Sequence, residues 1–361
     1  MTTLTTVLAH GVFAGARPDD DLADLRQLID EIGRRAAEFS VQRQRPQRHD
    51  DALWATLEET GLARLTSTPE LGAGPAESAV TLYGLARHSA AVAIAETDLL
   101  AAWLADAVGL AVPAAGALAI APAAGSLRDG RIAGTASAVA WPRSAAAVVL
   151  AVRTADGVWA GVVDAAALSI ADGLNLAGEP RDRITFDLPA DALRSVDPPV
   201  YDELLRRGAW ARCIQVIGAL DAAAASSVAH CRERVQFGRP LSKLQAVQQA
   251  LAGMAGEIER GRAAATLAIA AAVDDGFGSD RADYAVSVAK VVLGAVVDAV
   301  TTTAHQLHGA IGVSIEHPLW LATLRAQSWI GEFGTTTHHA GRLGARALAA
   351  DDPWDWVTGR V

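Results

Sequence analysis

The sequence is poor in cysteine, in aromatic residues and in positive charge. Its only cysteines, Cys213 and Cys231, are too few for a disulfide framework or a cysteine-rich metal site. Lys and Arg number 31 against 41 Asp and Glu, and the formal net charge of −10 argues against nucleic acid or an anionic membrane as partner. Aromatic residues make up 5% but hydrophobic residues 51%. Ala, Val and Leu therefore carry the apolar content, a composition typical of a folded, helix-rich chain.

The sequence also lacks a clear leader or membrane segment. The first 21 residues have no basic n-region, and His10 and two glycines interrupt their apolar stretch. The uncharged run at 107–125 is long enough to span a bilayer, but two glycines and two prolines break it. We therefore expect a cytoplasmic protein in a reducing environment, without membrane association.

The period of the hydrophobic residues changes twice along the 361 residues. Apolar residues at spacings of three and four predict helices over 19–40, 50–60 and 77–108. After residue 118, short β-branched runs alternate with turn signals. The runs AVVLAV and VWAGVV, separated by RTADG, predict a β-hairpin. From about residue 200 the helical spacing returns and continues through long segments joined by short loops.

These changes predict three domains in a mostly α fold with a small β domain. We expect an N-terminal helical domain at 1–117, a reduced middle β domain at 118–198 and a C-terminal four-helix-bundle domain at 199–361. About two-thirds of the chain should be helical.

Two segments of the C-terminal third are more specific than this domain order. They read RERVQFGRPLSKLQAVQ at 232–248 and QLHGAIGVSIEHPLWLATLRAQ at 306–327. At this separation they resemble the acyl-CoA dehydrogenase family, and the resemblance extends over roughly residues 20–348. It implies the acyl-CoA dehydrogenase-like fold, a tetramer, FAD as cofactor and α,β-dehydrogenation of an acyl-CoA thioester. In that family a carboxylate removes the α-proton while the β-hydrogen leaves as hydride.

The resemblance assigns contacts with the nucleotide end of FAD to both segments. It implies a pyrophosphate contact for Arg234, which suits a permanently charged, planar guanidinium. Ala310 replaces a glycine that is frequent in the family. The implied FAD-binding residues are Arg234, Gln236, Phe237, Leu241 and Gln245 in the first segment, and Gln306, Gly309 and Ala310 in the second. The alternative is a packed helix pair in which Arg234 is an ordinary surface residue and the glutamines join helices.

The segments that would hold the flavin ring depart from the family. The loop that in the family resembles T-E-P-x-x-G-S-D reads AIAPAAGSLRDG at 119–130. Aligned on Pro122, it has Ile120, Ala121 and Leu127 in place of the threonine and both acidic residues. In the next strand, Ala138 and Ala140 stand where the family has a Trp and a Thr. Trp141 lies nearby, at an offset that places it in the core.

The expected catalytic base is also missing. Counted along the second motif, one family position for the glutamate falls on Gly334. The other falls on Gly208, thirty residues before Gly238. Glu332 lies two residues from Gly334, and a helix step of one or two residues turns a side chain by roughly 100–200°. Glu203 lies five residues from Gly208, so neither glutamate should simply substitute. We therefore expect no catalytic residue in this chain, with Glu332 a solvated helix-end carboxylate and a displaced base as its alternative.

Four further features have simple structural interpretations. His338 and His339 are adjacent on a helix, so they face apart and form no metal site; we expect both at the surface or an interface. Lys290 is expected at a surface or interface as well. Glu316-His317-Pro318 predicts a helix break with local caps.

The retained and lost motifs separate into two groups. The family shares each FAD between subunits: one chain holds the flavin ring and the base, and the other holds the nucleotide end. This sequence keeps only the second group. It therefore resembles the base-lacking half of an α2β2 acyl-CoA dehydrogenase, of the kind that actinobacteria use on steroid side-chain CoA thioesters. The implied partners are a paralogous subunit, an acyl-CoA substrate and an acceptor similar to electron-transfer flavoprotein.

Two other functions stay open. One is a homotetrameric acyl-CoA dehydrogenase with a relocated base, Glu332 or Glu203. The other is a cofactor-free structural or regulatory subunit that merely retains the fold.

Overall fold

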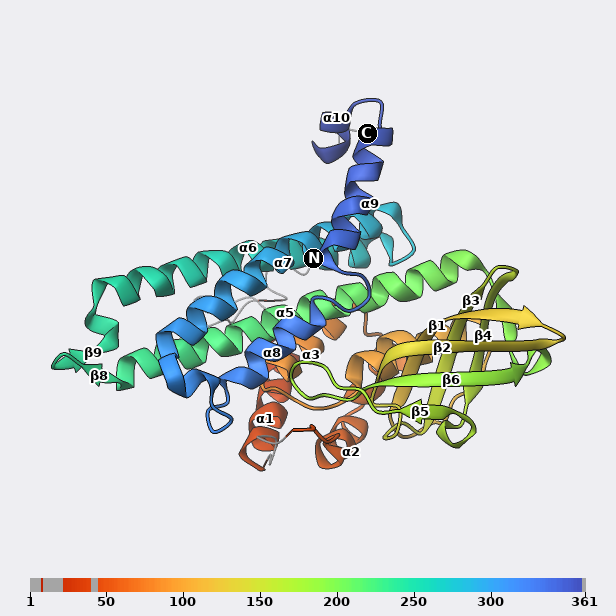
Figure 1. Ribbon diagram of the computed structural model, residues 1–361, viewed down its shortest axis with the longest axis horizontal. Helices are drawn as coiled ribbons and strands as arrows, with labels where there is room; N and C mark the ends of the chain where they lie inside the picture. Colours follow the sequence, from red (N-terminus) through yellow and green to blue (C-terminus); the bar gives the residue numbers. More distant parts are fainter. Residues whose placement is uncertain (1–7, 9–21, 40–44, 359–361) are drawn as a thin grey trace.

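The computed structural model of the protein describes residue 8 and residues 22–39 and 45–358. A helical unit comes first, a small sheet follows, and a bundle of long helices completes the chain (Figure 1). Helices account for 60% of the residues, slightly less than the two-thirds expected. The mostly helical fold with a small β unit is therefore confirmed.

The N-terminal unit packs short helices against the bundle. Asp50 caps the second helix by accepting a hydrogen bond from the Leu53 amide at 3.0 Å. The helix expected over 19–40 begins at Ala23, and residues 19–21 lie outside the described residues. The helices are α1 (Ala23–Phe39), α2 (Asp51–Glu59), α3 (Pro75–Arg87), the buried π-helix η4 (Ala95–Ala102) and α4 (Trp103–Ala107).

Seven strands form one sheet in the order β5-β6-β2-β1-β3-β4-β7. Strands β1 and β3 pair in parallel, and the other neighbours pair antiparallel. The predicted hairpin is confirmed, because β3 and β4 pair from Thr154–Gly157 outward. The strands are β1 (Leu118–Arg128), β2 (Arg131–Ala140), β3 (Ala147–Thr154), β4 (Gly157–Val163), β5 (Ser169–Ala171), β6 (Arg181–Pro189) and β7 (Arg194–Val196).

Strand β2 is irregular near its end. Its register against β6 shifts between Ala136 and Val139, and Ala138 and Trp141 have φ values of 58° and 52°. Such a bulge re-aims the side chains of a strand. Trp141 is buried with its ring 5.6 Å from that of His49, so its expected place in the core is confirmed.

Long antiparallel helices build the C-terminal unit. The short hairpin of β8 (Val235–Gln236) and β9 (Arg239–Pro240) joins the first two helices. The helix break at Glu316-His317-Pro318 is confirmed, since His317 Nδ1 accepts a hydrogen bond from the Leu319 amide at 3.2 Å. The helices are α5 (Pro198–Glu233), α6 (Gln245–Asp275), α7 (Asp280–His308), α8 (Leu319–Trp329), α9 (Thr336–Ala349) and α10 (Pro353–Thr358).

Two segments, Pro198–Glu233 and Asp280–Val313, are long and apolar enough to cross a membrane by length and composition. In the fold, 67% and 56% of their tested windows are buried inside the molecule. Their apolar residues therefore serve as the centre of the bundle. The uncharged run at 107–125 is a loop followed by the start of β1.

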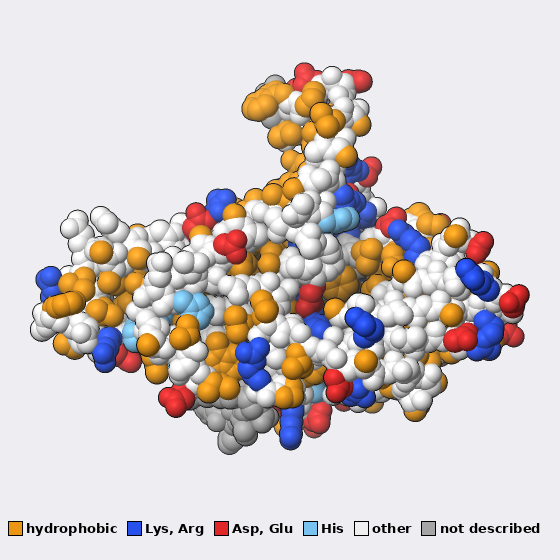
Figure 2. All heavy atoms as spheres, viewed as in Figure 1, with side chains coloured by type: hydrophobic (Ala, Val, Ile, Leu, Met, Phe, Trp, Pro, Cys, Tyr) orange, Lys and Arg blue, Asp and Glu red, His pale blue; other side chains and the backbone are white. Residues whose placement is uncertain are grey.

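The chain ends in an arm that projects from the bundle (Figure 1). Helix α9 packs against α7, and α10 lies beyond it. Figure 2 shows hydrophobic side chains and acidic groups together at the tip of the arm, where Leu348 is 88% and Trp354 66% exposed.

Candidate functional site

One end of the bundle carries the β8–β9 hairpin. At its turn Phe237 and Gly238 have φ values of 52° and 74°, both in the left-handed region. Glycine adopts this conformation without strain, whereas a bulky residue such as Phe237 rarely does. The Phe237 side chain is 88% exposed. Arg234 is exposed where α5 ends, and no carboxylate within the described part of the chain pairs with its guanidinium. This end therefore presents a cation and an aromatic ring to solvent.

The predicted FAD-binding residues gather toward this end. Helices α6 and α7 are antiparallel neighbours, so the start of α6 and the end of α7 face the same way as the hairpin (Figure 1). Gln245, Gln306, Gly309 and Ala310 are exposed, whereas Leu241 is half-buried. Figure 2 shows hydrophobic and basic side chains side by side at this end of the molecule.

Three histidines lie beneath the hairpin, a cluster that the sequence reasoning missed. The ring of His230 stacks on that of His308 with centroids 4.5 Å apart, and His317 lies 4.8 Å from His308. Burial, together with the charges of His308 and Arg234, lowers the pKa of His230. The only sequence signal is that His230 precedes Arg234 by one helical turn. Nowhere in the described residues do three or more His, Cys, Asp or Glu form a group that could hold a metal.

A second region lies between the sheet and the bundle. A cavity of about 310 Å³ is walled on one side by β1 and β2 and on the other by η4, α5 and the loop between α8 and α9. We call it the sheet-side cavity. Three positions at which the sequence departs from the family pattern, Ile120, Ala138 and Ala140, line it, whereas Ala121 and Leu127 do not. Its lining residues include Ile120, Pro122, Ser137, Ala138, Ala140, Glu96, Arg212, Glu332 and Phe333.

The two positions proposed for a lost base lie close to one another, around Phe333. A Cβ atom on Gly208 would lie 2.3 Å from the ring of Phe333, so a side chain there requires that ring to move. Gly334 has a φ of 100°, and a Cβ on it would lie 2.7 Å from His339 Nε2. Glycine is thus demanded at both positions by the packing.

The structure corrects the expectation that Glu332 is a solvated carboxylate. Its side chain is only 16% exposed, and both carboxylate oxygens accept hydrogen bonds. Arg181 Nε donates to Oε1 at 2.7 Å, and Arg212 Nε donates to Oε2 at 2.7 Å. The sequence prediction was wrong because these guanidiniums are 151 and 120 residues away in the chain.

Glu332 belongs to a larger buried set. Arg212 also pairs with Glu96 at 2.5 Å, and Arg181 pairs with Glu179 at 3.3 Å. Burial raises the pKa of Glu179, but the nearby Arg325 and Arg181 outweigh it and hold that pKa below its usual value. We call the six charged residues the ion network: Arg181, Arg212, Arg325, Glu96, Glu179 and Glu332.

Two further predictions are wrong, and both concern residues that contact the loop between α8 and α9. Lys290 is fully buried, not at a surface, and its Nζ donates to the carbonyls of Ile330 and Glu332 at 2.5 and 2.7 Å. Burial lowers its pKa to about 8. His338 is exposed as expected, but His339 is buried between Ser287 and the Phe333 carbonyl. Burial lowers the pKa of His339 to about 4.

Glu203, the other suggested base, is engaged as well. Its Oε1 lies 2.8 Å from Arg207 Nη2, one turn along α5. Glu203 is not among the residues that line the sheet-side cavity. The geometry therefore brings only Glu332 of the two suggested bases to that cavity.

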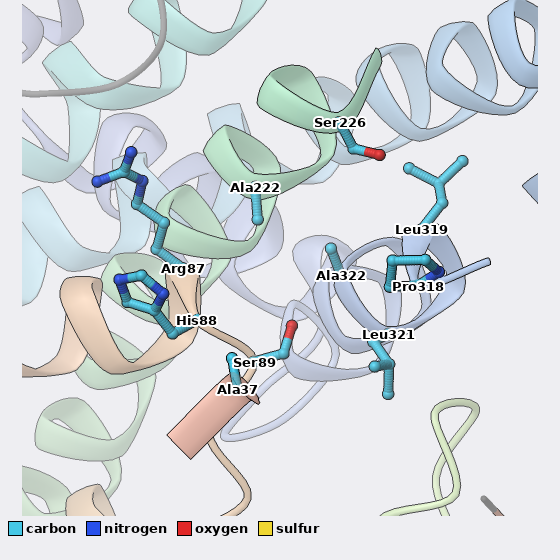
Figure 3. Close-up of a pocket in the computed structure, with 10 residues that line it drawn as sticks. All are labelled: Ala37, Arg87, His88, Ser89, Ala222, Ser226, Pro318, Leu319, Leu321 and Ala322. Carbon is cyan, nitrogen blue, oxygen red and sulfur yellow. The ribbon is translucent and has the colours of Figure 1, made fainter. Parts of the chain in front are cut away.

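Another hollow, of about 350 Å³, lies between α3, α5 and α8 (Figure 3). His88 and Arg87 reach it from the end of α3, and Ser226 from α5. Asp30 pairs with His88 at 2.7 Å and with Arg87 at 3.4 Å. Its lining includes none of the predicted site residues, and we assign it no function.

Part of the chain matches a known protein family. Residues 199–348 match the family model described as "Acyl-CoA dehydrogenase, C-terminal domain". The "Probable acyl-CoA dehydrogenase FadE2" of Mycobacterium tuberculosis is 39% identical over 107 residues. That match covers 30% of this chain and 26% of FadE2, much less than the full length of the relative.

Solved structures match over nearly the whole chain. The ChsE4-ChsE5 complex from Mycobacterium tuberculosis superposes with a TM-score of 0.78 at 22% identity, covering 92% of this chain and 98% of that chain. The Tcur3481-Tcur3483 steroid ACAD has a TM-score of 0.78 at 26% identity, covering 91% of this chain and 99% of that one. Residues 199–348 therefore match the C-terminal domain of the acyl-CoA dehydrogenase family, and the chain shares the fold of these solved structures over more than nine-tenths of its length.

Proposed function

We propose that this chain is one subunit of an FAD-dependent acyl-CoA dehydrogenase that forms an α,β-double bond in an acyl-CoA thioester. It supplies the half-site for the adenosine and pyrophosphate of FAD, while a partner subunit supplies the base and the flavin-ring site. The observation that carries this proposal is the contrast between an open, unpaired Arg234 at the bundle end and a sheet-side cavity without an available base.

The residues at the bundle end fit the nucleotide end of the cofactor. The exposed guanidinium of Arg234 suits a charge-assisted hydrogen bond to pyrophosphate. The exposed ring of Phe237 and the amide of Gln306 suit the rest of the nucleotide, with Gln236, Leu241, Gln245, Gly309 and Ala310 around them. When bound, FAD accepts the hydride from the substrate. The share of this chain is to bind and orient the cofactor.

The α-proton requires a general base, and among the described residues the sheet-side cavity offers only carboxylates that are already paired, Glu96 and Glu332. Gly208 and Gly334 cannot accept a proton, and both oxygens of Glu332 are held by guanidiniums. A base must reach the proton it abstracts within hydrogen-bond distance. This geometry argues against the homotetramer with a relocated base and favours a base on the partner. A cofactor-free subunit remains the third function, and the exposed motif at Arg234 argues against it.

The finer features of the proposal follow from the relatives. The likeness to a complex and to a protein named as a steroid ACAD supports an α2β2 assembly and a bulky substrate such as a steroid side-chain CoA thioester. We further propose a cytoplasmic location and an acceptor similar to electron-transfer flavoprotein. The three domains proposed from the sequence would then be 1–117, 118–198 and 199–361.

The test is to produce the chain alone and together with a paralogous subunit that carries the glutamate base. We expect a tetramer with two FAD, and no dehydrogenation by the isolated chain. Changing the glutamate of the partner to Gln should lower the rate about 10²–10⁴-fold. Four FAD per tetramer, or turnover by the isolated chain that Glu332→Gln abolishes, would refute the division of labour.

A further inference from the structure

Another cavity shares Phe333 with the sheet-side cavity and is rich in arginine. Its volume is about 470 Å³, within the range of sites that bind small organic molecules. Its walls come from β3, from the N-terminal parts of α5, α7 and α9, and from the loop before α9. We call it the arginine-lined cavity. Its charged lining residues are Arg153, Asp202, Arg206, Asp283 and Arg342.

Asp283 on α7 is the carboxylate around which the guanidiniums gather. Its side chain is only 7% exposed. Arg206 and Arg342 donate to its Oδ1 at 3.1 and 2.8 Å, and Arg342 and Arg346 donate to its Oδ2, both at 2.9 Å. Burial raises the pKa of Asp283, but Arg342 and Arg206 outweigh it and hold that pKa below its usual value. The carboxylate is therefore ionised, and its four acceptor positions are filled.

The arginines carry more N–H donors than Asp283 can accept. Arg342 reaches Asp283 through Nη2 alone, and its Nε and Nη1 have no hydrogen-bond partner in the part of the chain that the structure describes. Arg206 uses Nε for Asp283 and Nη1 for the Phe277 carbonyl, which leaves its Nη2. A guanidinium has five N–H donors and no acceptor. Arg206 and Arg342 therefore keep donors for a further acceptor at the cavity.

The other charges at the cavity do not cancel this surplus. Arg153 on β3 pairs with Asp202 on α5 at 2.6 Å, so these two neutralise each other. Arg346 is likewise matched by Asp280 at 2.7 Å. His338 on α9 also lines the cavity and is exposed. The lining thus carries three guanidiniums against two carboxylates.

Two helix ends add to the positive potential of the cavity. Asp283 lies in the first turn of the 29-residue helix α7, and His338 lies in the first turn of the 14-residue helix α9. The helix macrodipole favours an anion near the first turn. Figure 2 shows basic side chains and a histidine together at the base of the arm that α9 begins. Free donors, net charge and helix ends therefore all favour a negative ligand.

We propose that the arginine-lined cavity is an anion site that takes the phosphate group of a small organic molecule. The free donors of Arg206 and Arg342 reach the cavity from two different helices, α5 and α9. A tetrahedral phosphate presents acceptor oxygens in several directions, so it suits guanidiniums that approach from different sides. The volume leaves room for an organic part beside the phosphate. The site goes beyond the proposed function, because none of the predicted FAD-binding residues lines it.

The probe is inorganic pyrophosphate, which has two phosphate groups and no organic part. Isothermal titration calorimetry measures its binding to the full-length chain in a chloride buffer of low ionic strength. The test variant is Arg342→Gln, and Asp283 keeps Arg206 and Arg346 as partners in it. The matched control is Arg281→Gln on α7, because Arg281 is 51% exposed against 43% for Arg342 and does not line the cavity.

We expect saturable binding by the wild type and by Arg281→Gln, and binding about ten- to hundredfold weaker by Arg342→Gln. A wild type without saturable binding overturns the site, and so does an unchanged affinity in Arg342→Gln. Equal losses in Arg342→Gln and Arg281→Gln overturn it too, because both would then reflect surface charge alone. Should Arg342→Gln fail to fold, His338→Glu adds a negative charge at an exposed position, and the same weakening is expected.

Pyrophosphate can also meet Arg234 at the bundle end, so Arg234→Ala is titrated in parallel. Binding that persists in Arg234→Ala and weakens in Arg342→Gln belongs to the arginine-lined cavity. Binding that is lost in Arg234→Ala and unchanged in Arg342→Gln overturns the cavity site and leaves the proposed function intact. The proposed function is tested by FAD content, so the two can fail separately.

Discussion

The bundle end and the sheet-side cavity differ in whether their arginine is paired with carboxylates. At the bundle end Arg234 stands in solvent without a carboxylate partner among the described residues, beside an exposed Phe237. At the sheet-side cavity Arg212 is buried and bonded to two carboxylates. An arginine in the open is available to a ligand, whereas a fully paired one serves the fold. The same residue type is therefore open to a ligand at the bundle end and fully engaged within the fold at the sheet-side cavity.

The largest expected effect is on stability at the sheet-side cavity. Arg212→Ala leaves Glu96 and Glu332 without their common partner, and breaking a buried ion pair on one side typically costs about 3–5 kcal/mol. Urea unfolding of the isolated chain should show a loss of that size. Arg131→Ala, in an exposed pair, should change the free energy of unfolding by less than about 1 kcal/mol. Equal effects of the two substitutions would contradict a tightly paired network.

Burial of Lys290 makes the stability of the fold depend on pH in the alkaline range. Its pKa is about 8 in the folded chain against 10.5 when unfolded, so between these values the unfolded state binds more protons. Stability from this group therefore rises with pH across that window, by up to about 3 kcal/mol. Urea unfolding at pH 7 to 10 should show this rise in the wild type relative to Lys290→Met. Parallel curves for the two proteins would mean that Lys290 is not buried as a neutral amine.

Burial of His339 makes the stability of the fold depend on pH in the acid range, again rising with pH. Its pKa is about 4 in the fold against 6.5 when unfolded. The stability that it contributes is complete above pH 6.5 and is lost as the pH falls toward 4, by up to about 3 kcal/mol. Acid unfolding of His339→Gln should lack this component. The exposed His338→Gln is the control, and a like change in both variants would contradict the burial of His339.

The bundle end should respond in binding and not in stability. Arg234→Ala should weaken FAD retention by the assembled complex ten- to hundredfold, because a charge-assisted hydrogen bond contributes about 1.5–3 kcal/mol. Flavin absorbance after dilution and gel filtration measures the retention. Arg239→Ala, one hairpin strand away, is the matched control. Flavin occupancy unchanged in Arg234→Ala, or an equal loss in both variants, would make the motif structural.

Local signals were enough to predict much of this molecule. The β3–β4 hairpin, the helix break before Leu319 and the buried Trp141 follow from turn chemistry, capping and alternation within a few residues. Each of these depends on neighbours in the sequence.

The ion network could not be predicted in this way. Glu332 receives its bonds from Arg181 and Arg212, on another strand and another helix. Each of these charges, taken alone, looks like an ordinary surface residue, so the sequence predicts a solvated Glu332 and a Lys290 at a surface or an interface. Only the three-dimensional fold shows that they meet.

The contact between Gly208 and Phe333 has a consequence for the history of the chain. A glutamate restored at 208 would collide with the ring, since even its Cβ would lie 2.3 Å away. A base at this position therefore requires the Phe333 ring to move or a second substitution at 333. Under the proposed division of labour, this packing favours the continued dependence of the chain on its partner subunit.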